Sequence, residues 1–306
     1  MVSLGFLVFL SAVLIHLCIS SNAQPTYRYH ICSTAGNYTT GSQYRANFNS
    51  LFSSLSSNAT LHNVFYNATA GQNSDQVYAI YLCRGDASPD VCRDCVSASS
   101  QEILLRCPNQ KEAIIWFDEC MFRYSNRSIF ATMEDTPFGF LKNPNNYSDP
   151  VQFKQIREDL LERLVTKAIS DSSTGMFATR ETNFSGNLKI YGMVQCTPDI
   201  SLSDCNICLR GSVAEIPNCC EGKKGARVLK PSCNIRYESF PFIEQKATAP
   251  ASPTISDRED MTSLDASIQR RCFSWKVALT MMTRREMGYD RHSGDGKGND
   301  VPYHPI

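Results

Sequence analysis

The chain has 306 residues, with 30 basic and 30 acidic side chains and a formal net charge of zero. This balance gives no support to nucleic-acid binding, which needs a basic face. The hydrophobic share of 42% is high enough to build real cores, and the length suggests two domains of ordinary size.

The first residues predict the compartment. A nearly uncharged apolar run over residues 4–19 precedes Ser21-Asn22-Ala23, which has small residues where a signal peptidase reads. The run is short for a transmembrane anchor. We therefore interpret residues 1–23 as a signal peptide of a secreted, extracellular protein. Its removal takes Cys18, one of 14 cysteines, and the others should be mostly bridged in an oxidising compartment.

Glycosylation signals agree with secretion. The sequons begin at Asn37, Asn58, Asn67, Asn126, Asn146 and Asn183. One such triplet is noise, but this number behind a signal peptide predicts that several carry glycans.

The strongest feature is an internal repeat. The cysteines of the first copy are Cys83, Cys92, Cys95, Cys107 and Cys120, and they recur 113 residues later as Cys196, Cys205, Cys208, Cys220 and Cys233. Flanking residues keep the same offset, as when Arg123-Tyr124 recurs as Arg236-Tyr237. The chain is a tandem duplication, with the first copy predicted over 27–130 and the second over 135–243.

Each copy is expected to begin with an amphipathic helix. Apolar residues recur at helical spacing over 44–55 in copy one and over 153–165 in copy two. At the offset of 113, Phe48 maps onto Leu161, so we expect the two helices to correspond in that register.

A strand, a second helix and further strands follow. In copy one, residues 78–83 resemble a strand, Ser88 is a good N-cap with Pro89 behind it, and residues 113–117 are β-rich. Copy two repeats the plan, with Ser201 as the cap. The order predicts an α+β fold: two tandem copies of an antiparallel sheet with two helices packed on it, stapled by disulfides.

Zinc and redox chemistry are the alternatives to a disulfide framework. Cys92-x2-Cys95 resembles half of a metal knuckle, and such a pair also occurs in redox motifs. Each cluster lacks a second Cys-x2-Cys at ribbon spacing, and the chain has only five histidines. We therefore expect bridges, no metal and no cofactor, although the sequence alone cannot choose among the possible connectivities.

The Cys-x8-Cys-x2-Cys spacing inside a secreted double repeat, with Tyr-x4-Cys and Cys-x2-Arg-Tyr beside it, resembles the ginkbilobin-homologous domain over about residues 27–245. That domain makes up plant cysteine-rich repeat secretory proteins, plasmodesmata-located proteins and the ectodomains of cysteine-rich receptor-like kinases. The resemblance implies a protein of the plant apoplast that acts in defence or stress signalling. It also implies the bridges Cys32–Cys107, Cys83–Cys92, Cys95–Cys120, Cys196–Cys205 and Cys208–Cys233.

Copy two departs from this pattern at its first cysteine. The offset of 113 places Asn145 where Cys32 stands, so Cys220 loses its partner, and an extra cysteine, Cys219, stands beside it. We hypothesise a Cys219–Cys220 bridge. Neighbouring Cα atoms are closer than ordinary bridges prefer, so such a ring is strained and more reducible.

Resemblance to the antifungal ginkbilobin-type proteins implies a candidate mannose site in copy two. Those proteins bind the sugar through an Asn just after the first cysteine, an Arg six residues before the last and a Glu five after it. Copy two has Asn146, Arg227 and Glu238 at these positions, whose groups suit vicinal hydroxyls. Copy one has lost all three types, with Ser33, Ile114 and Ser125 instead.

Two observations oppose the sugar site. Asn146 heads a sequon, whose glycan would obstruct a pocket. A surface ion pair between Arg227 and Glu238 on neighbouring strands is the explanation that we favour over a sugar site.

The motifs of the common enzymes are missing. The chain lacks the nucleophile elbow, the zinc-protease motif, the P-loop and the protein-kinase signatures. It is therefore predicted to bind rather than catalyse, with a mannose-type cell-wall or fungal glycan or an extracellular receptor protein as partner. A Cys-x2-Cys redox protein is the alternative from another class.

Residues 247–306 differ in character from the repeats. They begin with a Pro- and Ala-rich linker composition, contain Cys272, and have no apolar run of membrane-spanning length. We predict a disordered tail. A truncated ectodomain of a cysteine-rich receptor-like kinase, without span and kinase, is a further alternative for the whole chain.

Overall fold

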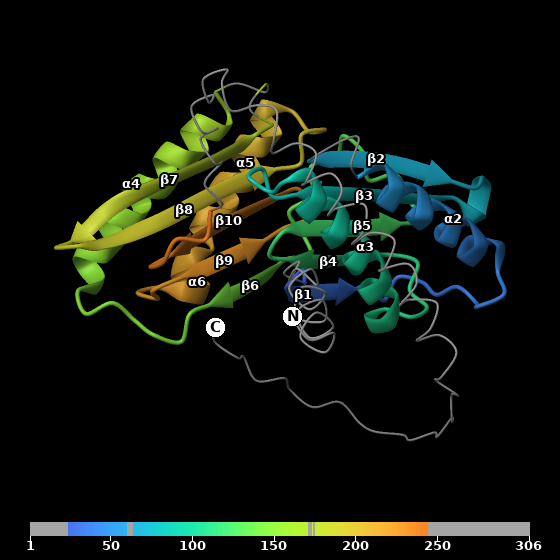
Figure 1. The fold of residues 1–306 in the computed structure, drawn as a ribbon, viewed down its shortest axis with the longest axis horizontal. Helices are drawn as coiled ribbons and strands as arrows, with labels where there is room; N and C mark the ends of the chain where they lie inside the picture. Colours follow the sequence, from blue (N-terminus) through green and yellow to red (C-terminus); the bar gives the residue numbers. More distant parts are fainter. Residues whose placement is uncertain (1–23, 60–63, 171–172, 174, 244–306) are drawn as a thin grey trace, which may run out of the picture. The chain divides into compact units, whose positions relative to one another are not determined.

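The computed structural model describes residues 24–59, 64–170, 173 and 175–243. Both copies of the repeat belong to one compact unit, Gln24–Gln245 (Figure 1). The predicted signal peptide, with Cys18, and the predicted tail, with Cys272, lie outside the described residues.

Copy one is an antiparallel five-stranded sheet with two helices. Its elements are β1 (Tyr27–Cys32), α2 (Gln43–Asn58), β2 (Phe65–Ala70), the 3-10 helix η1 (Asn73–Asp75), β3 (Val77–Cys83), α3 (Pro89–Arg106), β4 (Ala113–Phe117) and β5 (Cys120–Ser125). The strands lie in the order β1-β4-β5-β3-β2.

Copy two repeats this topology. Its elements are β6 (Gly139–Lys142), α4 (Pro150–Ala168), β7 (Phe177–Ser185), β8 (Leu188–Cys196), α5 (Leu202–Ala214), α6 (Ile216–Cys220), β9 (Ala226–Leu229) and β10 (Cys233–Glu238). The order β6-β9-β10-β8-β7 matches copy one strand for strand. The predicted α+β fold of two stapled sheets with helices is confirmed.

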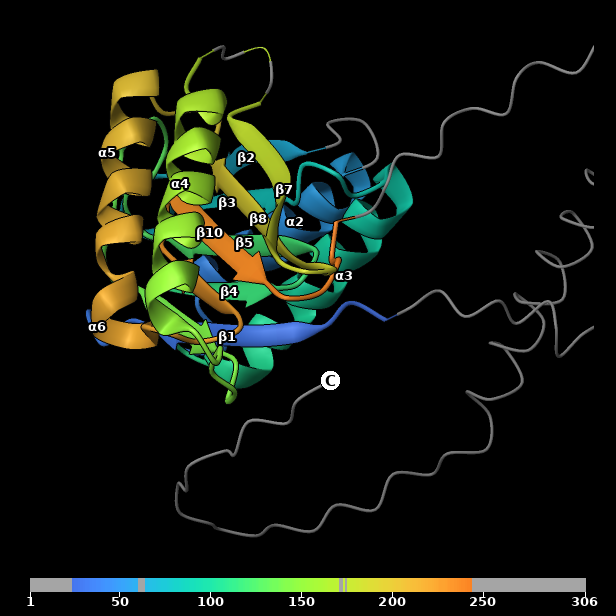
Figure 2. The ribbon, with the colours of Figure 1, turned by 90° about the vertical axis from the view of Figure 1, so that its left-hand side faces the viewer.

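The second helix of copy two is divided, which the sequence analysis did not predict. Pro217 lies in the first turn of α6, where copy one has Leu104 inside the continuous helix α3. Proline cannot donate a helical hydrogen bond, and its ring clashes with the preceding turn. Figure 2 shows α4 and α5 side by side, with α6 at the end of α5.

The helices begin at capping residues. The Ser88 side chain accepts from the Val91 N–H at the start of α3, and the Ser201 side chain accepts from the Asp204 N–H at the start of α5. Each cap satisfies a backbone donor that the first helical turn leaves free.

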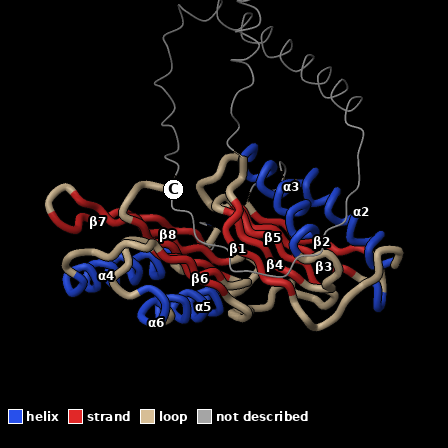
Figure 3. Tube along the Cα trace, turned by 90° about the horizontal axis from the view of Figure 1, so that it is seen from below, coloured by secondary structure: helices blue, strands red, loops and turns tan. Residues whose placement is uncertain are grey.

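Both sheets have buried residues on both of their faces. Along β4, Ala113, Ile115 and Phe117 join the core under the helices, whereas Ile114 and Trp116 join a different cluster. This cluster also contains Leu229 of β9, and Leu141 of β6 packs against it. The helix-free faces of the two sheets therefore pack on each other, and Figure 3 shows the helices of the two copies on opposite sides of the strands.

The expected register is wrong at the first strand of copy two. Cys32 pairs with Ala113 and Lys142 pairs with Ala226, so Lys142 takes the place of Cys32. These two residues are 110 positions apart, not 113. Copy two has three more residues between its first strand and its cysteine cluster. Asn145 therefore lies three residues past the position of Cys32, to which the offset of 113 assigned it.

The first helices also correspond in another register. Isolated bridges just before them join Asn37 to Gln110 and Asn146 to Lys223, an offset of 109 on the helix side. Phe48 packs on Tyr124, with ring centroids 4.6 Å apart, and Arg157 lies 5.8 Å over Tyr237. Arg157, not Leu161, is the counterpart of Phe48. A shift of four residues keeps a helix face in register, so the apolar pattern could not reveal it.

Candidate functional site

Six disulfides lie in the described chain, and they are the pairs named above. They join Cys32–Cys107, Cys83–Cys92, Cys95–Cys120, Cys196–Cys205, Cys208–Cys233 and Cys219–Cys220. Cys92 and Cys95 thus have different partners, and each ties α3 to a strand. They are not bonded to each other as a redox pair would be.

The structure brings Arg227 and Glu238 together. Arg227 on β9 is the register partner of Arg236 on β10, and Glu238 lies two residues further along β10, on the same face. Arg227 Nε lies 3.8 Å from Glu238 Oε1, and Arg236 Nε donates to the same oxygen at 3.1 Å. The side chains of Arg227 and Glu238 are only 11% and 9% exposed, so the pair is not a surface ion pair.

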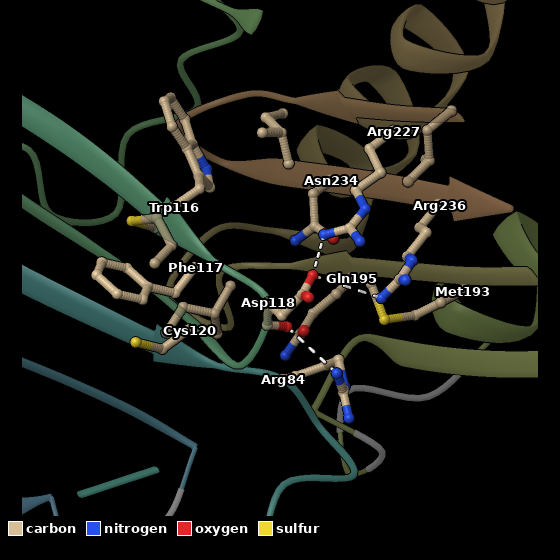
Figure 4. A pocket seen from close by; sticks show the side chains of 14 residues that line it. Arg84, Trp116, Phe117, Asp118, Cys120, Met193, Gln195, Arg227, Asn234 and Arg236 are labelled. Atoms are coloured by element: carbon tan, nitrogen blue, oxygen red, sulfur yellow. Dashed lines mark hydrogen bonds and ion pairs between the residues drawn. The ribbon is translucent and has the colours of Figure 1, made fainter. Parts of the chain in front are cut away.

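A carboxylate from copy one completes this cluster. Asp118, in the turn between β4 and β5, forms short ion pairs with Arg227 and with Arg28, and its Oδ1 lies 3.7 Å from Arg236 Nη1. Figure 4 shows Asp118 reaching between Arg227 and Arg236, while Arg84 donates to its carbonyl. We call Arg28, Asp118, Arg227, Arg236 and Glu238 the interdomain ion cluster.

The electrostatics of the cluster follow from burial and mutual charge. Burial disfavours ionised Asp118, but the hydrogen bond from Arg28 and the charges of Arg227 and Arg236 outweigh it and lower its pKa to about 2. Burial raises the pKa of Glu238 despite the nearby arginines. Burial and the charge of Arg227 lower the pKa of Arg236 to about 10.

Asn146 does not join the cluster. It is exposed and pairs with Lys223, four residues before Arg227, which is about 13 Å along an extended chain. The position after the missing cysteine belongs to Asn143 instead. Its N–H donates to the Gly225 carbonyl at 2.8 Å, as the Ser33 N–H donates to the Glu112 carbonyl at 3.0 Å in copy one. The assignment of Asn146 used the offset of 113, which fails at this strand.

A pocket opens beside the interdomain ion cluster. Its lining includes Trp116 and Asp118 of copy one and Gln195, Arg227 and Arg236 of copy two (Figure 4). Its volume is about 40 Å³, which has room for ordered water but not for a sugar ring. Sequence reasoning found Arg227 and Glu238 and noted Arg236 only as a repeat position. It missed Asp118, because no local pattern marks a contact between copies.

Two further contacts fix the copies to each other. Glu134, in the connecting segment, pairs with Arg123 and Arg127 of copy one, and its N–H donates to Ser232 Oγ at 2.8 Å. The Gln195 amide of copy two donates to the carbonyl of Cys83 at 2.9 Å, and this bond is buried.

The sequon asparagines are accessible. Asn37, Asn126, Asn146 and Asn183 are exposed, and Asn58 and Asn67 are partly buried. Asn67 and Asn183 lie in β2 and β7, the outer edge strands of their sheets. Across the described part of the chain, no helix combines the length and apolar character needed to cross a membrane.

Comparison with known proteins gives a consistent result. A family model described as salt stress response/antifungal matches residues 31–127 and 141–240, one range in each copy. Cysteine-rich repeat secretory protein 38 of Arabidopsis thaliana is 39% identical over 231 residues, which cover 75% of this chain and 91% of that protein. An antimicrobial ginkbilobin-2-like protein of Castanea crenata is 38% identical over 216 residues, 71% of this chain and 88% of that one.

Receptor-type proteins match as well. Cysteine-rich receptor-like protein kinase 25 of Arabidopsis thaliana is 44% identical over 236 residues, 76% of this chain. The chain spans about a third, 35%, of that kinase's length. The crystal structure of the tandem DUF26 ectodomain of the Arabidopsis thaliana cysteine-rich receptor-like protein PDLP8 matches with a TM-score of 0.61 and 25% identity, over 71% of this chain and 99% of that one.

Proposed function

The chain belongs to the salt stress response/antifungal family of cysteine-rich extracellular proteins, and from this premise we propose that it is a binding protein of the plant apoplast that acts in defence or stress signalling. Its relatives include a secreted repeat protein, an antimicrobial protein and a receptor-like kinase, of which this chain spans only about a third, 35% of its length. The same binding role holds if the chain is an ectodomain form of a receptor-like kinase.

We favour an extracellular receptor-type protein over a mannose-type glycan as the partner. The observation that carries this choice is Asp118, which pairs with Arg227 inside the molecule. A sugar hydroxyl would have to displace this buried carboxylate, and breaking such a pair costs about 3–5 kcal/mol. A protein partner can instead contact the outer surfaces of two copies that are held in fixed relation.

The test is a direct comparison of the two partner classes. Protein secreted from plant cells is screened against a panel of extracellular receptor domains and, in parallel, against immobilised mannan. We expect saturable binding to at least one receptor domain, and no mannan retention that free mannose reverses. Mannose-reversible retention of the wild-type protein, lost on Arg227→Ala, would contradict the protein-partner choice.

The glycan remains a second candidate because one relative is antimicrobial and copy two carries Asn143, Arg227 and Glu238 near one another: Asn143 bonds to Gly225, two residues before Arg227, and Glu238 lies two residues after the register partner of Arg227. Copy one, with Ser33 and Ile114 in the matching positions, is not expected to bind sugar. If mannan binding is found, Asn146→Gln should leave it intact, because Asn146 lies away from Arg227.

A further inference from the structure

The end of α6 carries chemistry that the proposed binding function does not use. Cys219 and Cys220 are bonded to each other with Cα atoms 3.7 Å apart. Ordinary disulfides place their Cα atoms about 4.4–6.8 Å apart, and closer approach stores strain and makes a bridge easier to reduce. The Cα atoms of the other five bridges are 5.5–6.1 Å apart, so among those described this one alone lies outside the normal range of Cα–Cα distance.

The Cys219–Cys220 bridge contributes little to the stability of the fold. A disulfide stabilises a fold mainly by closing a loop in the unfolded chain, and the effect grows with loop length. This bridge joins residues at a sequence separation of 1, whereas Cys32–Cys107 closes a separation of 75. Opening the ring therefore frees almost no chain, and the fold does not require it to stay closed.

The alternative partner has been removed from copy two. Cys220 holds the position of Cys107, but Lys142 replaces Cys32 opposite it, and the Lys142 ammonium donates to the Cys219 carbonyl at 3.4 Å. Every cysteine in the described ranges is already bridged. No described thiol stands ready to exchange with this pair from within the chain.

The two sulfurs differ in access, and basic side chains lie near this end of copy two. Cys219 is partly buried, while Cys220 is 1% exposed. Three lysines belong to this end of copy two: Lys142, which donates to the Cys219 carbonyl, Lys223, whose ammonium donates to the Pro144 carbonyl at 3.2 Å, and Lys224, which lies over the Tyr147 ring. The acidic neighbours are Glu215 and Glu221, and Glu221 pairs with Arg157 at 3.4 Å. A net basic setting favours the approach of an anionic thiolate to Cys219, whereas Cys220 lies in the hydrophobic core, where the thiolate is disfavoured and the thiol is the expected product.

We propose that the Cys219–Cys220 bridge is a thiol-exchange site for a small thiolate of the glutathione type. The incoming sulfur bonds to Cys219 Sγ, the Cys219–Cys220 bond breaks, and the electron pair leaves on Cys220 Sγ, which takes a proton from water. The product is a mixed disulfide at Cys219 and a thiol at Cys220. Attack of the Cys220 thiolate on that mixed disulfide re-forms the ring and releases the small thiolate, so no further oxidant is needed.

The test uses the intact secreted protein and reduced glutathione as the probe. After incubation at graded concentrations, free thiols are blocked with N-ethylmaleimide, and every cysteine is mapped by mass spectrometry. We expect a glutathione adduct on Cys219 and a blocked thiol on Cys220 at a concentration about tenfold lower than any other bridge requires. The five other bridges are internal controls in the same sample.

Two variants make the result decisive. Cys219→Ser with Cys220→Ser should fold and give no adduct in the low range. Lys142→Gln should slow adduct formation, and Lys154→Gln, on exposed helix surface, should not. The proposal is overturned if this bridge opens only together with the others, if adducts form first elsewhere, or if the untreated protein holds these cysteines as free thiols or bonded to Cys272.

Discussion

At the scale of single residues, Asp118 has the largest consequence, because one carboxylate of copy one neutralises arginines from both copies. Its contacts were not predictable from sequence. Spacing within a repeat identifies residues that share a strand or a helix face, and it says nothing about which turn of one copy meets which strand of the other. Arg227 and Glu238 were found because they lie at fixed distances from one cysteine.

We expect Asp118 to control the acid stability of the protein. Its folded-state pKa of about 2 lies below the ordinary value of 3.8, so its ion pairs contribute stability above about pH 4 that is lost as the pH falls toward 2. The contribution is on the order of 2 kcal/mol. The contribution of Glu238 to stability changes with pH in the opposite direction. Burial raises its pKa, so protonation on acidification removes the cost of burying its charge.

The measurement is urea unfolding across that pH range for the wild type and for Asp118→Asn. The variant should be less stable at neutral pH and should lose less stability between about pH 4 and pH 2. Asp159→Asn, which removes an exposed partner of Arg163, is the matched control and should change neither. Parallel pH profiles for the wild type and Asp118→Asn would exclude the role assigned to Asp118.

A substitution of Arg157 is expected to increase the stability of the protein. It is 1% exposed, and its Nε and Nη1 atoms have no hydrogen-bond partner within the described residues. At the corresponding position of copy one, Phe48 packs against Tyr124. Replacing a buried charge by a well-packed hydrophobic group is often stabilising, so Arg157→Phe should raise the free energy of unfolding by about 1 kcal/mol.

Chemical denaturation of the two proteins checks this expectation. Arg157→Ala is the control, since it removes the charge but leaves a cavity against Phe153 and Tyr237 and should lower stability. A loss of more than about 1 kcal/mol in Arg157→Phe would mean that this arginine stabilises the core.

At the scale of elements, the repeat made most of the fold predictable. Two helices, the strands beside the cysteines, and the caps at Ser88 and Ser201 follow from periodicity and capping. What failed was register. A helix face repeats after about four residues, so the apolar pattern could not show that Arg157 corresponds to Phe48. Copy two is also three residues longer after its first strand, so the constant offset did not show that Lys142 corresponds to Cys32.

The disulfide bridges should differ in how much they stabilise the fold, according to the length of the loop that each one closes. Removing Cys95–Cys120, with a separation of 25, by a double Cys→Ser change should cost about 3 kcal/mol of stability. Removing Cys219–Cys220 in the same way should cost well below that figure. Thermal unfolding of the two double variants measures the difference, and equal losses would contradict the loop-length explanation.

At the scale of the whole molecule, the two copies should unfold as one cooperative unit, because the helix-free faces of both sheets are buried against each other. Gly139 marks this contact. A Cβ there would lie 2.3 Å from the Tyr29 ring of copy one, so we expect Gly139→Val to push that ring aside and loosen the contact between the copies.

Calorimetry of the secreted protein should show a single transition for the wild type and two for Gly139→Val. Gly41→Ala is the matched control, since a Cβ at Gly41 meets nothing within 4 Å, and it should keep the single transition. Two transitions in the wild-type protein would show that the copies are energetically independent.

The covered sheet faces make this chain an intramolecular dimer. Ile114, Trp116 and Leu229 would lose part of their cover in a lone copy, which would then expose an apolar patch that favours self-association. Fusion supplies the second half at a fixed high local concentration, independent of how dilute the secreted protein becomes. It also removes the constraint of identical subunits. A change such as Lys142 or Arg157 can arise on one side alone, leaving one copy free to specialise while the other preserves the shared scaffold.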